Sequence, residues 1–295
     1  MTVRGQLPCT DQSLLRNDPM YGTASAGIAW ALFELSGPWG HSAFLESPRI
    51  IDPTLGRAIA RRVEADGMRV VAIRRHGRRP DPPRWRWFMA WSEEGNEALY
   101  GGEVSGPEEY LDLALDGSDG DRITEPLVAV CTHGKHDQCC AVRGRPSMAS
   151  VAAAYPEQAW ECSHIGGDRF AANMLILPDG LCYGRVDLTD AADIVARYDD
   201  GLVANEFLRG RSSVPHAVQA AQYFARERSG DDRIHAFAPI AVDRVDHHIE
   251  VRLAGDSGPV DVVLAERMTD PLLSTCSASV TGRVRTFVLV SITFA

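Results

Sequence analysis

The chain has 295 residues, a net charge of −10 and 24% charged residues. Its 45% of hydrophobic residues indicates a globular protein rather than a disordered one, and its length is sufficient for two domains and a smaller appendage. The acidic balance argues against nucleic-acid binding, which usually depends on a basic surface.

Apolar segments are short throughout the sequence. The longest runs, such as residues 28–33, fall far below the length that crosses a membrane, and the N-terminus lacks the apolar core of a signal peptide. We therefore expect a cytoplasmic protein in which thiols stay reduced. In that setting the seven cysteines favour metal ligation or redox chemistry over a disulfide framework.

The first part of the chain, residues 1–122, predicts a small α/β domain. Residues 1–26 form a leader with little periodicity, in which Cys9 is expected to be a buried thiol and not a ligand. Residues 74–80 form a basic loop that predicts a solvated turn, with docking of an acidic partner or a phosphate as the alternative. The other elements, in order, are a strand at 28–35, a helix that starts at Asp52-Pro53 and ends by residue 67, strands at 68–73, 85–91 and 99–100, and a helix at 107–113.

The second part, residues 123–230, predicts another α/β domain. A buried strand at 127–130 ends at Cys131, and a long loop runs from there to Arg145. The elements that follow are a helix at 146–154, a strand at 160–163, a turn or short helix at 166–172, hairpin strands at 174–177 and 182–186, a helix capped by Thr189, and a helix capped by Ser212 or Ser213. The order of helices and strands repeats that of the first domain and suggests an internal duplication.

The last part, residues 231–295, predicts a small β appendage. Apolar residues alternate at 249–253 and at 260–264 on either side of a Gly-Asp-Ser-Gly turn, and a final strand covers 287–294. We expect Cys276 to be structural, and His247 and His248 to be surface or edge-strand residues.

Candidate ligands are concentrated in the second domain. Cys131 ends a strand, Cys140 follows in a loop that contains glycines, and His164 and Asp168 flank a pair of glycines after the next strand. The ends of neighbouring strands and the loops after them can converge on one point. Sulfur and imidazole ligands favour a transition metal, and a two-iron cluster takes four protein ligands, usually thiolates and sometimes histidines on one iron. Glycines allow the backbone to approach such a cluster closely.

Several strings of this chain resemble the sucrase/ferredoxin-like family. The resemblance covers about residues 1–230 and implies a thioredoxin-like [2Fe–2S] ferredoxin core in the order β-α-β-α-β-β-α, which agrees with the elements predicted at 126–200. The strings are Cys-Thr-His-Gly-Lys-His-Asp-Gln-Cys-Cys at 131–140, Gly-Arg-Pro at 144–146, His-Ile-Gly-Gly-Asp-Arg-Phe-Ala-Ala-Asn at 164–173, Gly-Pro-Trp-Gly at 37–40, Tyr-Gly-Arg at 183–185 and Arg-Gly-Arg-Ser-Ser at 209–213.

The resemblance also implies a [2Fe–2S] cofactor and its ligands. In eukaryotic relatives the pattern is Cys-x8-Cys followed by His-x3-His, so that Cys131 and Cys140 match the two cysteines and His164 matches the first histidine. Asp168 stands at the position of the second histidine. An aspartate oxygen is an unusual cluster ligand and is expected to make the cluster more labile.

The neighbouring residues leave alternatives open. Cys162 lies two residues before His164, on the same strand face, and is a second candidate for the fourth ligand. Cys139 can compete with Cys140. Other polar residues of these strings have two possible roles. His133 and His136 are either hydrogen-bond donors to the cluster or ordinary loop residues, and Lys135 and Arg169 are either solvated or tune the charge near the site. Asn173 and Arg185 are expected to pair with the backbone.

The leading functional hypothesis is a one-electron carrier that exchanges electrons with a redox partner protein, either a reductase or an acceptor. A neutral imidazole in place of a thiolate should raise the reduction potential, and a titrating histidine ligand should make that potential fall as the pH rises. One alternative is a structural zinc site of Cys131, His133, Cys140 and His164. The other is a thiol–disulfide oxidoreductase, which is disfavoured because the chain lacks Cys-x-x-Cys and because adjacent cysteines form a strained disulfide.

Overall fold

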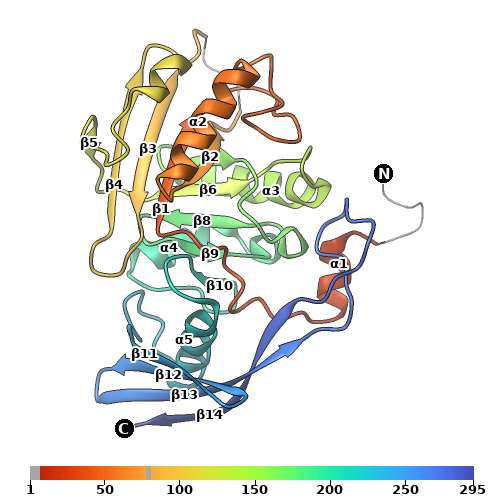
Figure 1. The fold of residues 1–295 in the computed structure, drawn as a ribbon, viewed down its shortest axis with the longest axis vertical. Helices are drawn as coiled ribbons and strands as arrows, with labels where there is room; N and C mark the ends of the chain where they lie inside the picture. The colour runs from red at the N-terminus through yellow and green to blue at the C-terminus, as the bar shows by residue number, and fades with distance from the viewer. Residues whose placement is uncertain (1–6, 78–80) are drawn as a thin grey trace.

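The computed structural model of the chain describes residues 7–77 and 81–295. Residues 1–6 of the predicted leader and residues 78–80 of the predicted basic loop lie outside these ranges. The chain forms a mixed sheet of ten strands and a separate antiparallel sheet of four strands at its C-terminal end (Figure 1). The fold therefore belongs to the expected α/β class. Within the described ranges, no helix combines the length and the apolar character that a membrane crossing requires.

The N-terminal half of the large sheet is built from β1 (Ala29–Glu34), α2 (Pro53–Ala65), β2 (Arg69–Arg74), β3 (Trp85–Trp91), β4 (Ala98–Val104), the 3₁₀ helix η1 (Pro107–Leu111) and the short edge strand β5 (Asp121–Arg122). β1 pairs in parallel with β2 and antiparallel with β3, which forms a hairpin with β4. Helix α2 begins where predicted because the Asp52 carboxylate accepts hydrogen bonds from the amides of Thr54 and Leu55.

The C-terminal half repeats this topology. β6 pairs in parallel with β7 and antiparallel with β8, and β8 pairs with β9, so both halves place their strands in the order second, first, third, fourth. The repetition seen in the predicted element order therefore extends to the sheet. The elements are β6 (Leu127–Cys131), α3 (Gln138–Ala154), β7 (Ala159–Cys162), η2 (Asp168–Phe170), β8 (Met174–Leu177), β9 (Leu181–Tyr183), η3 (Val186–Leu188), α4 (Ala191–Asp199) and β10 (Leu208–Arg211).

The two halves join edge to edge through β2 and β7, which run antiparallel. Arg74 of β2 forms an ion pair of 2.7 Å with Glu161 of β7, and the Thr132 hydroxyl donates a hydrogen bond of 2.9 Å to the same carboxylate. Cys162 lies opposite Ile73 across this seam and opposite Cys131 on its other side. The seam therefore runs directly beside the cysteine that ends β6.

Helix α3 is longer than the sequence predicts. A loop was expected from Cys131 to Arg145, but α3 already begins at Gln138 and contains Pro146. Asp137 is the cap, since its side chain accepts a hydrogen bond of 2.8 Å from the amide of Cys139. A proline inside a helix removes one hydrogen bond, and the helix continues past it with Met148 and Val151 buried in the core beside β6.

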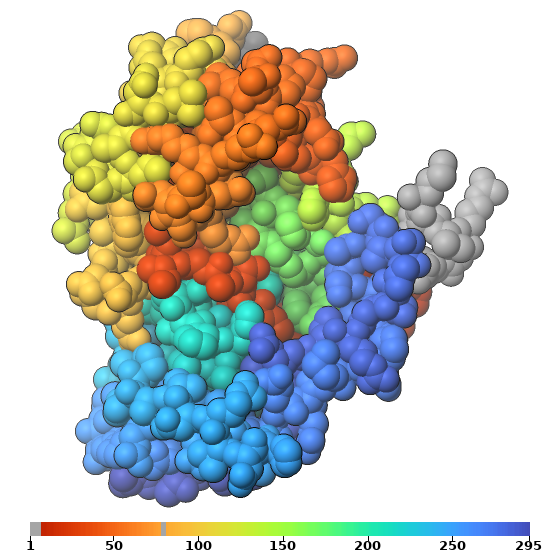
Figure 2. All heavy atoms as spheres, viewed as in Figure 1, coloured from red at the N-terminus to blue at the C-terminus, as the bar shows by residue number. Residues whose placement is uncertain are grey.

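The four-stranded sheet carries helix α5 (His216–Ser229) on one face. Its strands are β11 (Pro239–Val245), β12 (His248–Gly255), β13 (Gly258–Met268) and β14 (Arg285–Phe294). The connection between β13 and β14, residues 269–284, runs back along the molecule to helix α1 (Cys9–Leu15), where the blue segment lies beside the red helix in Figure 1 and is seen on the right-hand side of the view in Figure 2. No helix was expected in the leader, so α1 corrects that prediction.

Candidate metal centre

A close approach of helix α3 to the end of β6 brings two cysteines together. Cys131 is the last residue of β6, and Cys140 lies in the first turn of α3. A Cβ atom at residue 144 would collide with the backbone carbonyl of Cys131, so glycine is required for the helix to lie this close to the strand. Both cysteines are buried. The Gly-Arg-Pro string thus contributes to the position of a candidate ligand.

A tight loop after β7 reverses the chain between His164 and Asp168. Gly166 and Gly167 have φ angles of +92° and +88°, which glycine adopts without steric cost. A side chain at residue 167 would in addition collide with the guanidinium of Arg209. The glycine pair therefore turns the chain back, so that the Asp168 carboxylate lies beside His164.

Two buried side chains hold this loop in place. Arg209 of β10 donates a hydrogen bond of 2.8 Å to the carbonyl of Gly166, and Asn173 donates one of 2.9 Å to the carbonyl of Gly167. Arg209 also donates to the Asn173 side chain at 3.0 Å. The expected pairing of Asn173 with backbone is thus present, and its effect is to fix the loop that carries Asp168.

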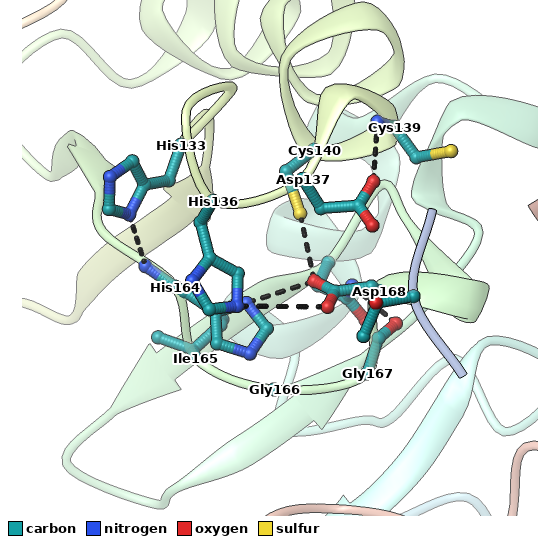
Figure 3. A network of polar contacts seen from close by, with 12 residues as sticks. His133, His136, Asp137, Cys139, Cys140, His164, Ile165, Gly166, Gly167 and Asp168 are labelled. Carbon is teal, nitrogen blue, oxygen red and sulfur yellow. Dashed lines mark hydrogen bonds and ion pairs between the residues drawn. The ribbon is translucent and has the colours of Figure 1, made fainter. Parts of the chain in front are cut away.

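The candidate ligands converge at these strand ends. One ligand atom from each of Cys131, Cys140 and His164 lies within 4.8 Å of the other two. The Asp168 carboxylate lies 3.0 Å from Nδ1 of His164 and accepts a hydrogen bond of 3.3 Å from the Cys140 thiol. Figure 3 shows the Cys140 sulfur directed at the Asp168 carboxylate, with the His164 ring on the other side of that carboxylate.

His136 lies against the same group. Its ring stacks on that of His164 with the centroids 3.8 Å apart, and its Nε2 atom lies 3.8 Å from the second oxygen of Asp168. Burial lowers the pKa of His136, and the charge of His164 lowers it further. The sequence analysis weighed His136 as a donor or a loop residue, and no spacing in the sequence marks it as a possible ligand. The capped start of α3 directly after it determines where the ring lies.

His133 supports the site without facing it. Its Nε2 atom donates a hydrogen bond of 2.7 Å to the carbonyl of Gly40, and its Nδ1 atom accepts one of 3.3 Å from the amide of His164. Both ring nitrogens are therefore engaged in the neutral form, and burial lowers the pKa of this histidine. The Trp39 ring packs edge-on against it at 5.5 Å, which connects the Gly-Pro-Trp-Gly string to the centre.

The part of the sequence that forms this centre matches the model of a known family. The model of the sucrase/ferredoxin-like family matches residues 22–210, which include both halves of the large sheet and all of these side chains. The chain belongs to the sucrase/ferredoxin-like family. No curated protein and no solved structure matches it.

Two cysteines that the sequence offered as alternative ligands lie outside the group formed by Cys131, Cys140 and His164. Cys162 contacts the Cys131 sulfur but is not within the group formed by Cys131, Cys140 and His164. The Cys139 sulfur points away from that of Cys140 (Figure 3) and lies 3.2 Å from the sulfur of Cys276. Competition between Cys139 and Cys140 is therefore not favoured, since successive residues of a helix point in directions about 100° apart.

The side chains of this centre differ in the direction of their pKa shifts. Hydrogen bonds from Cys140 and then Cys162 lower the pKa of Cys131, and the same contact with Cys131, together with burial, raises the pKa of Cys140. Burial alone would lower the pKa of His164, but Asp168 and Cys131 outweigh it and raise that pKa to about 9. A metal bound here would therefore displace protons from Cys140 and His164.

The remaining polar residues of the family strings take different positions. Lys135 is exposed, as expected of a solvated charge. Arg169 is buried and lies over the Phe170 ring at 4.5 Å, which corrects the expectation that it is solvated. Arg185 donates hydrogen bonds to Ser13 and to the carbonyl of Asp18, so it ties the leader to the core.

Proposed function

We propose that this protein is a one-electron carrier that holds a [2Fe–2S] cluster through Cys131, Cys140, His164 and Asp168. The observation that carries the proposal is the convergence of two buried sulfurs and an imidazole within 4.8 Å. Thiolates and imidazoles are the ligands that two-iron clusters take. A bound cluster would supply reversible one-electron oxidation and reduction, which no side chain of this centre supplies.

The donor set suits such a group. Nδ1 of His164 is buried and makes no hydrogen bond of good geometry, although Asp168 lies close to it. An imidazole nitrogen in this situation is available to a metal. Cys140 lies in the first turn of α3, where the helix dipole and the backbone amides favour a thiolate. His133 and Arg209 hold the segments that carry the ligands, in the way that outer residues of metal sites commonly do.

Asp168 is the proposed fourth ligand. Its carboxylate is only 2% exposed and contacts both the Cys140 sulfur and the His164 ring. The neutral His136 ring is the alternative, since it lies near the same carboxylate. Cys162 is less suited because it belongs to none of the groups of converging ligand atoms, whereas Asp168 forms such a group with His136 and His164.

The fold proposed for each half is thioredoxin-like. A central strand has a parallel neighbour on one side and two antiparallel strands on the other, in both halves. In the C-terminal half, α3 lies between the two parallel strands in sequence and α4 follows the hairpin. The cluster-binding half would then be a thioredoxin-like ferredoxin, and the other half would be a second copy of the fold without ligands.

A redox partner protein would reach the centre through two histidines. The side chains of His136 and His164 are 27% and 25% exposed, whereas Asp168 is buried. The loop that carries His136 also lines a cleft of about 580 Å³, whose residues include Lys135, His133 and Arg145 but neither of these two histidines. We expect the docking face of the partner to be acidic, because Lys135 and Arg145 are exposed at this cleft.

Anaerobic purification followed by analysis of iron and acid-labile sulfide tests the proposal. We expect equal amounts of iron and sulfide, about two of each per chain, with a visible absorption spectrum that is bleached on reduction. Cys131→Ala should abolish all three signals. Cys182→Ala is the matched control, because Cys182 is also a buried strand cysteine but belongs to no group of converging ligand atoms. A protein that binds no iron under these conditions, in the presence of an iron–sulfur assembly system, would contradict the proposal.

One observation favours a second candidate, a single zinc ion at the same centre. Three ligand atoms within 4.8 Å also suit one tetrahedral metal, with Asp168 or His136 as the fourth ligand. The zinc set that the sequence suggested differs, since both nitrogens of His133 are engaged elsewhere. Zinc without sulfide, lost in Cys131→Ala, would establish this candidate instead. A dithiol enzyme is not supported, because the Cys139 and Cys140 sulfurs have separate partners.

A further inference from the structure

Three cysteines from distant parts of the chain meet beside helix α3. The Sγ atoms of Cys9, Cys139 and Cys276 lie 3.8 Å (Cys9–Cys139), 3.2 Å (Cys139–Cys276) and 3.4 Å (Cys9–Cys276) from one another. The second oxygen of Asp137 lies 3.9 Å from the Cys9 sulfur, and one ligand atom of each of the four residues lies within 4.8 Å of the other three. We propose that these four residues bind a single thiophilic metal ion, Zn²⁺, as a structural clamp.

The spacing fits one ion. A Zn–S distance of about 2.3 Å in a tetrahedral site places neighbouring sulfurs about 3.8 Å apart, and the three separations are 3.8, 3.4 and 3.2 Å. A disulfide would need a separation of about 2.05 Å. Four ligands match the coordination number of closed zinc sites, and thiolate and carboxylate groups both bind zinc.

The surroundings of the three sulfurs are those of metal-bound thiolates. The backbone amide of Cys9 donates to the Cys276 sulfur at 3.4 Å, and the Thr10 hydroxyl donates to the Cys139 sulfur at 3.3 Å. Such donors stabilise negative charge on ligand sulfurs. Cys139 also lies in the first turn of α3, as Cys140 does, so the helix dipole favours both thiolates.

Asp137 is held so that it can serve as the fourth ligand. Its two oxygens accept hydrogen bonds from the amides of Cys139, at 2.8 Å, and of Cys276, at 2.6 Å. A carboxylate oxygen accepts more than one contact, and the oxygen bonded to Cys276 is the one nearest the Cys9 sulfur. The helix cap and the metal ligand are then the same side chain.

The proposed metal ion would connect three segments that lie far apart in the sequence. Cys9 belongs to α1, Cys139 to α3, and Cys276 to the connection between β13 and β14. Arg143 of α3 binds Asp11 of α1 as well, so α1 already lies against α3 in the right orientation. Cys9 and Cys276 lie outside residues 22–210, the part that matches the family. Two of the four proposed ligands therefore lie outside the matched region, and the site is separate from the proposed cluster.

Metal analysis of the full-length protein, produced with iron and zinc supplied, tests the clamp. We expect about one zinc ion per chain, lost in Cys9→Ser and in Cys276→Ser, while iron and sulfide remain at the level of the unchanged protein. Cys131→Ala should show the reverse, with iron lost and zinc kept. This crossed design separates the two sites, so that failure of the proposed cluster would leave the zinc result interpretable.

Replacement by cobalt in the unchanged protein covers the case in which a variant does not fold. Co²⁺ in this site should give the intense sulfur-to-metal absorption and the visible bands of a tetrahedral thiolate complex. Three results would overturn the clamp: no zinc and no such cobalt spectrum, zinc that stays in both folded variants, or a disulfide between Cys139 and Cys276 in protein alkylated without reductant.

Discussion

The two halves of the large sheet share one strand order but end their central strands in different chemistry. β1 ends at Glu34, which is fully buried and pairs with Arg86 at 2.7 Å. β6 ends at Cys131, which meets Cys140 and His164. The shared topology provides a buried point where a strand end and the next parallel strand meet, and the residue types decide whether an ion pair or a group of possible metal ligands forms there.

The lengths of the connections explain why the cysteine and histidine side chains converge in the C-terminal half. Residues 132–137 connect β6 to α3, so the first turn of the helix lies beside the strand end. Residues 35–52 connect β1 to α2, and this longer segment separates the helix start from Glu34. A short connection therefore adds helix amides and a second cysteine to the strand end, as an anionic centre requires.

Substitution of the residue that ends the central strand of each half should give the largest difference in iron content. Cys131→Ala should remove all bound iron, because it deletes one of the two sulfur ligands. Glu34→Gln at the corresponding position should keep iron at the normal level and lower the free energy of unfolding by about 3 kcal/mol, because a buried ion pair loses one charge. Iron analysis and urea unfolding measure the two responses. Equal iron content in the two variants would show that the halves do not differ as described.

The glycine loop should give the next largest effect. Gly167→Ala forces a side chain against Arg209 at a φ angle of +88°, and we expect iron occupancy to fall about tenfold because the ligand-bearing loop is displaced. Gly201→Ala is the control, since Gly201 also has a positive φ angle but has open space around it. That variant should lose about 1 kcal/mol of stability and no iron. A normal iron content in a folded Gly167→Ala protein would count against the role of this loop.

The choice of fourth ligand should give a smaller and more selective effect. Asp168→Asn should lower iron occupancy and shorten the lifetime of the cluster in air, because the proposed ligand loses its charge. His136→Gln should leave iron content unchanged and alter only the rate of electron exchange at the surface. The opposite result, with His136→Gln as the damaging change, would assign His136 as the ligand. Iron content and the decay of visible absorbance distinguish the two.

The smallest expected effect concerns the metal-free protein. The pKa of His164 is raised to about 9 from an ordinary value of about 6.5, so the folded chain keeps a proton that the unfolded chain has lost between these values. The added stability is fully present below about pH 6.5 and is lost as the pH rises through about 9. Thermal unfolding of metal-free protein should therefore show a falling melting temperature over this range, and His164→Gln should flatten the dependence. An unchanged slope in that variant would mean that another group titrates.

The sequence was sufficient to predict the parts of this molecule that depend on local pattern. The alternation at Trp85–Trp91 and the Asp52 cap predicted β3 and α2 almost to the residue. Pro146 misled the prediction of α3, because proline favours a helix start and only tertiary packing shows that the helix extends through it. The cysteine and histidine spacing identified the group that converges, and the family match supports that reasoning.

Long-range contacts were beyond the reach of sequence patterns. Cys9 and Cys276 each appeared alone in the sequence, and their meeting with Cys139 depends on the path of the β13–β14 connection. His136 was recognised as a neighbour but not as a ring stacked on His164. Both cases require the relative placement of segments that no local periodicity encodes.

The most direct test of the central claim is electron paramagnetic resonance of the chemically reduced protein, grown with ¹⁵N-labelled histidine. We predict the signal of a reduced [2Fe–2S] cluster with a strong hyperfine coupling to histidine nitrogen, and loss of that coupling in His164→Cys while the cluster signal persists. A cluster signal without nitrogen coupling, or an iron-loaded protein without the signal, would contradict the assignment of His164 as a cluster ligand.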